Sequence, residues 1–367
     1  MTIAPSFSQF APTAGAVTPL RQAITAAYRR SEPDCLAPLI EAATLPPSQS
    51  AQVRDTAAAL VSALRANRKR SGIEELVQEY TLSSQEGVAL MCLAEALLRI
   101  PDKATRNALI RDKVAAGDWR AHLGGNKPLF VNAATWGLVI TGKLVGSVNE
   151  EGLSAALTRL VARAGEPAIR SGVDIAMRLM GEQFVAGESI ETALKHARKM
   201  EAKGFLYSYD MLGEAAATAA DAQRFHDDYE RAIHAIGQSA KGRHVYERAG
   251  ISVKLSALHP RYSRAQADRV MAELLPRVAH LAALARRYDI GFNIDAEEQD
   301  RLELSLDILE GLAIDPTLAG WNGLGFVVQA YGRRCPFVID WIVDLAHRTD
   351  HRIMVRLVKG AYWDAEI

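Results

Sequence analysis

Cysteine is scarce in this sequence, and long apolar runs are missing. The 367 residues include three cysteines, Cys35, Cys92 and Cys335, which lie far apart and form no CxxC pair. This spacing argues against a disulfide framework and against a thiolate metal site. No run approaches the roughly 18 apolar residues that cross a bilayer, and the N-terminus lacks the pattern of a signal peptide. We therefore expect a cytoplasmic protein that rests at most on a membrane surface.

Net charge is also absent, because Lys plus Arg and Asp plus Glu both number 43. No overall field therefore attracts nucleic acid or anionic lipid. One basic cluster, RANRKR at residues 65–70, leaves open a non-enzymatic module in which an N-terminal helix dimerises or binds nucleic acid. A solvated helix face is the more ordinary explanation of that cluster.

Several catalytic signatures are missing as well. The nine histidines form no HxH, HExxH or HxxEH pattern, and only His259 follows a predicted strand, which argues against metal catalysis. There is no GxSxG motif and no cysteine at a strand end, so acyl transfer lacks support. We expect no metal in the active site.

Helix signals fill the first third of the chain. Segments such as LRQAITAAYRR carry apolar residues three and four positions apart, and Pro46 and Pro47 mark a place where helices stop. We expect a flexible N-terminus over residues 1–18, a helical arm and helical domain over 19–117, and a connector over 118–150.

Residues 151–367 begin with helices and then alternate short β-rich runs with amphipathic helices. The runs are GFLYSYDML, ISVKLSAL, DIGFNIDAE, GLGFVVQAY and RIMVRLVKGAY, which begin at residues 204, 251, 289, 323 and 352. Repeated β-then-α units of this kind are typical of an α/β fold with a parallel sheet. An open doubly wound sheet and a closed (β/α)8 TIM-like barrel both fit this alternation.

Polar residues at the ends of the five runs favour the barrel. In a barrel all strand carboxyl ends meet at one face, so such residues converge on one site. A doubly wound nucleotide binder should instead carry GxGxxG or GxxxxGK[ST], and neither occurs. Solvated loop positions are the alternative explanation for each residue taken singly. The residues are Asp210, Lys254, Asp295 with Glu297, Gln329, and Arg356 with Lys359.

The second and third runs suggest a charge pair. Alternation points Lys254 into the barrel together with Ser252 and Ser256, and an inward lysine requires an anion. Asp295, in NIDAEE, could balance the ammonium group and hold it in place. An exposed lysine on an irregular strand is the simpler alternative.

The segment VRLVKGAYWD combines cations with a glycine turn. Gly360 would let main-chain N–H groups approach a phosphate or a flavin edge, Lys359 can neutralise a pyrophosphate, and Trp363 can cover a ring. A turn without a ligand, with Tyr362 and Trp363 in the core, fits the same residues.

These segments resemble a known family. DMLGEAA, SVKLSALHPRYS, NIDAEEQDRLELSLD, GFVVQAYGRRC and VRLVKGAYWDAEI, in this order, resemble the proline dehydrogenase barrel of bacterial bifunctional proline utilization A (PutA) proteins. The resemblance extends over most of the chain from about residue 60. It implies FAD-dependent oxidation of L-proline to Δ1-pyrroline-5-carboxylate, with hydride passing from proline C5 to flavin N5 and electrons then passing to a membrane quinone. Peripheral association with the inner membrane is implied with it.

The resemblance also implies residue roles. Lys254 would contact the proline carboxylate with support from Asp295, while Asp210 and Glu214 would line the substrate entrance. Gln329 would bond the flavin ring edge and Arg356 would lie near its reactive middle. The other implied FAD-binding residues, which serve the phosphates and the sides of the ring, are Val358, Lys359, Gly360, Ala361 and Trp363.

Some family features have no counterpart here. They are the paired arginines of an RRLLENGANSSFV-like helix, a later His-containing strand, the NAD-dependent aldehyde dehydrogenase domain and the ribbon-helix-helix DNA-binding segment. We therefore expect a barrel truncated after its fifth strand and no DNA binding. We also expect this chain alone to bind FAD weakly or not at all and to lack activity. A homodimer is one expectation for the parent protein.

Overall fold

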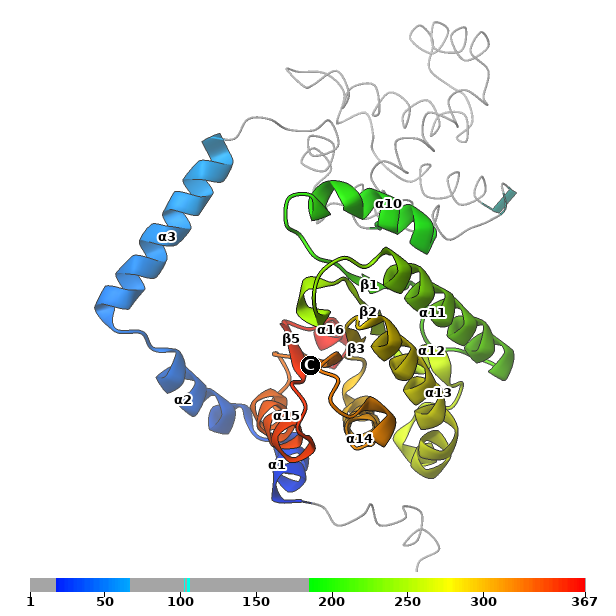
Figure 1. The fold of residues 1–367 in the computed structure, drawn as a ribbon. Coiled ribbons are helices and arrows are strands. Elements are labelled where there is room, and N and C mark those ends of the chain that lie inside the picture. The colour runs from blue at the N-terminus through cyan, green and yellow to red at the C-terminus, as the bar shows by residue number, and fades with distance from the viewer. Residues whose placement is uncertain (1–17, 67–101, 103, 106–184, 367) are drawn as a thin grey trace, which may run out of the picture. The chain divides into compact units, whose positions relative to one another are not determined.

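The computed structural model describes residues 18–66, 102, 104–105 and 185–366 (Figure 1). The predicted connector and the helices expected between residues 67 and 184 lie outside the described residues. Contacts divide the chain into two units, one formed by Met1–Thr44 with Leu194–Ile367 and the other by Leu45–Ala193. Each unit is described by itself.

The first unit contains one sheet of five parallel strands in the order β1-β2-β3-β4-β5. Each strand overlaps one of the five predicted runs, with β2 beginning one residue before its run, and consecutive strands pair with each other. This arrangement confirms the predicted α/β fold with a parallel sheet, and the sequential strand order is the one expected for part of a (β/α) barrel. The strands are β1 Ser208–Asp210, β2 Gly250–Val253, β3 Phe292–Ile294, β4 Leu324–Gln329 and β5 Met354–Val358.

Long helices connect the strands and lie along the outside of the sheet (Figure 1). They are α11 Ala219–Ser239, α13 Ala267–Tyr288, α14 Leu302–Ala313 and α15 Cys335–Thr349, and the short helices α12 Leu255–Leu258 and α16 Trp363–Glu366 follow β2 and β5. The core between sheet and helices is apolar. Ile251, Phe292, Leu274 and Leu309 are fully buried, which removes apolar surface from water.

Local sequence signals explain where these helices begin and end. At the start of α11 the hydroxyl of Thr218 accepts a hydrogen bond from the Asp221 amide, and the Asp221 carboxylate accepts one from the Thr218 amide, both at 3.1 Å. This capping box satisfies amides that have no partner within the helix. Asp289 and Asp350 end α13 and α15 in the left-handed conformation, which suits a helix terminus.

The N-terminal segment is helical, as predicted for residues 19–66. It forms α1 Pro19–Ala27, α2 Glu32–Ala43 and, in the second unit, α3 Pro47–Ala66, so the expected break at Pro46 and Pro47 is present. A further helix, α10, covers Ile190–Glu201. None of the described helices combines the length and the apolarity needed to cross a membrane.

Helix α1 packs on α15 within the first unit. Its Arg21 guanidinium lies 4.3 Å from the ring centre of Trp341 and donates a hydrogen bond of 2.6 Å to Asp307. Ile24 and Ala27 are buried in the same contact. An aromatic face, a carboxylate and apolar burial therefore hold α1 in place.

Candidate active site

Lys254, where β2 meets α12, lies between two carboxylates. Its Nζ is 2.6 Å from Oδ1 of Asp210, at the end of β1, and 3.0 Å from Oδ2 of Asp295, after β3. The side chains of Lys254 and Asp295 are 14% and 18% exposed. Burial lowers the pKa of Lys254, but the hydrogen bond and charge of Asp210 and the charge of Asp295 outweigh it, so the pKa lies above its usual range. Lys254 is held as an ammonium ion.

Arg356 brings a second cation from β5. Its Nη2 lies 3.9 Å from Oδ1 of Asp295 and donates a hydrogen bond to the buried hydroxyl of Ser252 on β2. Its Nε is shielded from solvent and has no hydrogen-bond partner among the described residues. Asp295 therefore lies between two cations, and the Nε–H group of Arg356 has no acceptor among the described residues.

Backbone contacts fix Lys254 and Asp295. The hydroxyl of Tyr229, fully buried on α11, accepts a 3.1 Å hydrogen bond from the Lys254 amide. Burial raises the pKa of Tyr229, so its hydroxyl stays neutral. Asp295 donates its own amide to the Val253 carbonyl at 2.9 Å and accepts from the Ala296 amide with Oδ1 at 3.0 Å. The backbone that carries the Lys254 and Asp295 side chains is therefore fixed at the ends of the strands.

Glu214 lies on the loop between β1 and α11 and is exposed. That loop is tied to α12, because Ser256 accepts from the Ala215 amide with its hydroxyl at 3.0 Å and from the Ala216 amide with its carbonyl at 2.9 Å. Burial and then the charge of Glu214 raise the pKa of Tyr362, which follows β5. Glu214 is thus an exposed carboxylate on a loop that is tied to the end of β2 through α12.

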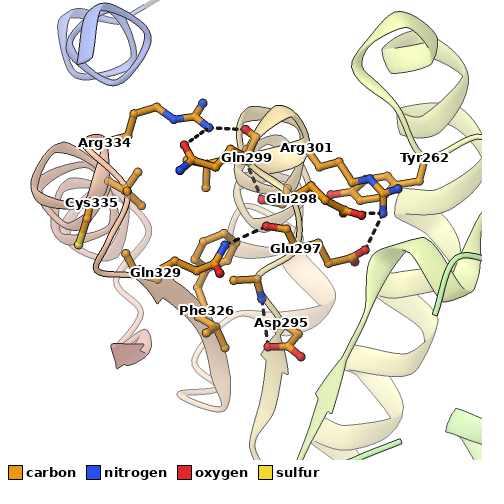
Figure 2. Close-up of a pocket in the computed structure, with 17 residues that line it drawn as sticks. Tyr262, Asp295, Glu297, Glu298, Gln299, Arg301, Phe326, Gln329, Arg334 and Cys335 are labelled. Carbon is orange, nitrogen blue, oxygen red and sulfur yellow. Dashed lines mark hydrogen bonds and ion pairs between the residues drawn. The ribbon is translucent and has the colours of Figure 1, made fainter. Parts of the chain in front are cut away.

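Gln329, at the end of β4, connects two loops. Its Nε2 donates to the Glu297 carbonyl at 2.9 Å (Figure 2), and its Oε1 accepts from the Ala361 amide at 3.0 Å. Gly360 has φ 116°, and a Cβ at that position would overlap the ring of Tyr331. The turn after β5 therefore requires glycine.

The other predicted cofactor residues follow the same turn. The carbonyls of Val358 and Lys359 accept hydrogen bonds from the amides of Ala330 and Tyr331, at 2.8 and 3.2 Å. The Lys359 side chain is exposed, and Trp363 is 55% exposed at the start of α16. The alternative that placed Trp363 in the core is therefore wrong.

A pocket opens beside these residues, between the ends of β3 and β4 and the first turns of α14 and α15 (Figure 2). Glu297, 5% exposed, lines it and accepts hydrogen bonds from the Ser256 amide at 3.0 Å and from Arg301 at 2.8 Å. Burial raises the pKa of Glu297 in spite of these bonds. The sequence placed Glu297 among the strand-end residues but did not show that it joins the β2, β3 and β4 ends.

The residues around β5 fit a flavin nucleotide. Arg356 has a buried guanidinium nitrogen without a partner among the described residues. At Gly360 the main chain carries no side chain, because a Cβ there would overlap the ring of Tyr331. Lys359 adds an exposed cation next to that main chain. Anionic phosphates and a polar ring edge require donors and cations of this kind. The Gln329 amide already has two protein partners and retains one N–H for a ring edge.

Comparisons with known proteins agree with this arrangement. Residues 193–367 match the family described as proline dehydrogenase, 72–184 its DNA-binding domain, and 18–65 the proline utilization A proline dehydrogenase N-terminal domain. The chain is 65% identical to the bifunctional protein PutA of Rhizobium meliloti over 98% of its own length and 63% identical to that of Escherichia coli K12 over 95%. It spans 29% and 27% of those relatives.

A solved structure of a variant of PutA from Bradyrhizobium japonicum superposes with a TM-score of 0.64 at 44% identity, covering 92% of this chain and 34% of that one. The parallel sheet and the matches therefore define a barrel of the proline dehydrogenase class. The chain belongs to the proline utilization A (PutA) family.

One prediction needs correction in part. The absence of a ribbon-helix-helix segment led us to expect no DNA binding, yet residues 72–184 match a family described as the DNA-binding domain of proline dehydrogenase. Most of these residues lie outside the part of the chain that the structure describes, so the family match alone makes the correction.

Proposed function

We propose that the strand ends of this sheet form a proline dehydrogenase site, where L-proline is oxidised to Δ1-pyrroline-5-carboxylate with FAD as the cofactor. One observation carries the proposal: the Lys254 ammonium is held between Asp210 and Asp295 at the ends of three neighbouring strands. A fixed, partly buried cation is the group that a substrate carboxylate needs. Family membership makes proline the substrate to test first.

The two carboxylates would play different parts when proline binds. Asp210 is 42% exposed, so it can turn toward solvent and give up its place beside Lys254 to the proline carboxylate. Asp295 is 18% exposed and bonded to the Ala296 amide, so it stays and keeps the ammonium oriented. Glu214 would meet the substrate on entry.

FAD, when bound, supplies the hydride acceptor for proline C5, and the chain supplies orientation and charge. Arg356 would lie near the reactive part of the ring, and Gln329 would use its remaining N–H at the ring edge. The phosphates and the sides of the ring would meet Val358, Lys359, Gly360, Ala361 and Trp363. No histidine is needed as an acid or base, because hydride transfer requires little proton movement by the protein.

The test uses the full-length protein that contains these residues. We expect Lys254→Met to reduce kcat/KM for L-proline by at least about tenfold through a higher KM, because a charge-assisted bond to the substrate is lost. Lys241→Met, which removes an exposed lysine before β2, is the matched control. Equal kcat/KM values in the two variants would overturn the assignment. Activity should also rise between about pH 6 and 9, since the proline amine must lose its proton.

The electrons are proposed to pass to a membrane quinone, with the protein cytoplasmic and in peripheral contact with the inner membrane. We also propose that residues 1–367 expressed by themselves bind FAD weakly and do not oxidise proline, since the described sheet has five strands and a closed barrel of this class has eight. Stoichiometric flavin absorbance in this purified polypeptide, together with dye reduction by proline, would contradict that.

Binding of nucleic acid is the second candidate function, and the family match of residues 72–184 favours it. The discriminating experiment is a gel shift with duplex DNA at rising salt, because phosphate contacts weaken as salt increases. A salt-sensitive shift that depends on residues 72–184 would support it. Protection of the strand ends by a proline analogue tests the enzyme separately.

A further inference from the structure

His226, on α11, has a buried nitrogen without a partner. The residue is 9% exposed, and its Nδ1 is shielded from solvent with no hydrogen-bond partner among the described residues. Buried imidazole nitrogens are usually paired, since leaving one unpaired costs free energy. The position therefore calls for a ligand that the protein itself does not provide.

Two carboxylates lie near this imidazole. Asp227 Oδ1 lies 3.8 Å from Nδ1 of His226, and ligand atoms of His226, Asp227 and Glu230 all lie within 4.8 Å of one another. His226 and Glu230 are four residues apart in α11, a spacing that places both on one helix face. The donor set is thus one imidazole and two carboxylates.

A second imidazole comes from α13, which packs against α11. The His280 ring stacks on the His226 ring with centres 5.5 Å apart, and its Nε2 lies 3.7 Å from Oε1 of Glu230. The four side chains therefore bring donors from two helices to one place.

The charges around the cluster suit a cation. The Arg277 guanidinium is engaged with the Gln223 side chain and the Ala222 carbonyl, each at 3.0 Å. The carboxylates of Asp227 and Glu230 carry two negative charges against this one guanidinium.

We propose that His226, Asp227 and Glu230, with His280 as the fourth ligand, bind a divalent transition-metal ion such as Zn²⁺ that links α11 to α13. Imidazole and carboxylate ligands suit zinc. Zinc bonds of about 2.0–2.2 Å bring neighbouring ligand atoms to about 3.3 Å from one another. The carboxylates of Asp227 and Glu230, 58% and 39% exposed, must therefore turn inward toward the buried imidazole.

The bound metal would stabilise the packing of α11 on α13. No residue of the cluster belongs to the proposed proline site, so this inference does not rest on the proposed function. Its failure leaves that function untouched.

The test is a calorimetric titration of the chelator-treated full chain with ZnCl2, paired with thermal unfolding. We expect one saturable site and a melting temperature that rises with zinc. His226→Gln and Glu230→Gln should each weaken zinc binding at least about tenfold. His347→Gln, which removes an exposed histidine on α15, should bind as the original chain does.

Glu230 is partly exposed, so Glu230→Gln tests the site even if His226→Gln fails to fold. The proposal is overturned if zinc shows no saturable binding, or if Glu230→Gln and His347→Gln bind zinc equally well.

Discussion

Replacing Lys254 by methionine is the sharpest perturbation of the site's stability. The substitution keeps the apolar length of the side chain and removes the ammonium group from between Asp210 and Asp295. Two carboxylates then face each other without their shared cation. We expect the folded protein to lose stability.

The burial of the two ion pairs determines how much folding stability Lys254→Met loses. The contact with Asp210 is partly in water, since that carboxylate is 42% exposed, and contributes below about 1 kcal/mol. The contact with Asp295 is more buried, and leaving Asp295 without Lys254 costs about 1–2 kcal/mol, below the range for fully buried pairs because Arg356 lies 3.9 Å away. The total is about 2 kcal/mol, which corresponds to about 4–8 °C in melting temperature for a domain of this size.

The assay is urea or thermal unfolding followed by circular dichroism, across pH. The pKa of Lys254 is raised in the folded state, so its stabilisation is complete below the ordinary lysine pKa of about 10.4 and is lost as pH rises through the higher folded value. The stability difference between the two proteins should therefore be flat from about pH 6 to 9. Lys254→Met with Asp295→Asn should recover part of the loss, because the uncompensated charge is gone. A double variant no more stable than Lys254→Met would refute the reasoning.

Three further results are expected. Gly360→Ala should destabilise by about 2–4 kcal/mol in denaturation, because its φ is positive and a Cβ overlaps Tyr331, whereas Gly320→Ala, also at positive φ but in open space, should cost only about 1 kcal/mol. Tyr229→Phe should cost about 1–2 kcal/mol in the same measurement, since the buried amide of the site lysine loses its acceptor; an unchanged stability would contradict this. Burial raises the pKa of Glu297. The stability of the original protein relative to Glu297→Gln should therefore be greatest below the ordinary pKa of about 4.3 and fall as pH rises above it. If this stability difference instead grows with pH, the charge of Arg301 outweighs burial.

The fold was predictable because its signals are local. The β4 run GLGFVVQAY is short, apolar and bounded by glycine, and it forms a strand over Leu324–Gln329. Helix α13 was visible from apolar residues at helical spacing, although Pro276 lies inside it. The parallel order follows from the alternation itself, because each long helix returns the chain to the same end of the sheet.

The contact between Lys254 and Asp295 was also predictable, since both end strands that prove to be neighbours. The contact with Asp210 was not foreseen as an ion pair, because it depends on the position of β1 at the sheet edge. Spacing along the chain identifies which residues reach the site face. It does not show which carboxylate reaches which cation.

The hydrogen bonds that support the site residues could not be predicted from the sequence, for a different reason. Tyr229 occupies a helix position that any buried aromatic could take, and only the structure shows its hydroxyl on the Lys254 amide. Gln329 was expected to face a ligand, yet its amide spans the Glu297 carbonyl and the Ala361 amide. Such bonds join residues more than 20 positions apart and leave no periodic trace in the sequence.

The most direct test of the central claim is anaerobic addition of L-proline to the full-length protein loaded with FAD. The account predicts that proline bleaches the flavin absorbance and that Lys254→Met shifts the half-saturating proline concentration upward by at least about tenfold, while Lys241→Met does not. If Lys254→Met is bleached at the same proline concentration as the original protein, the ammonium between Asp210 and Asp295 does not bind the substrate and the proposed site is wrong.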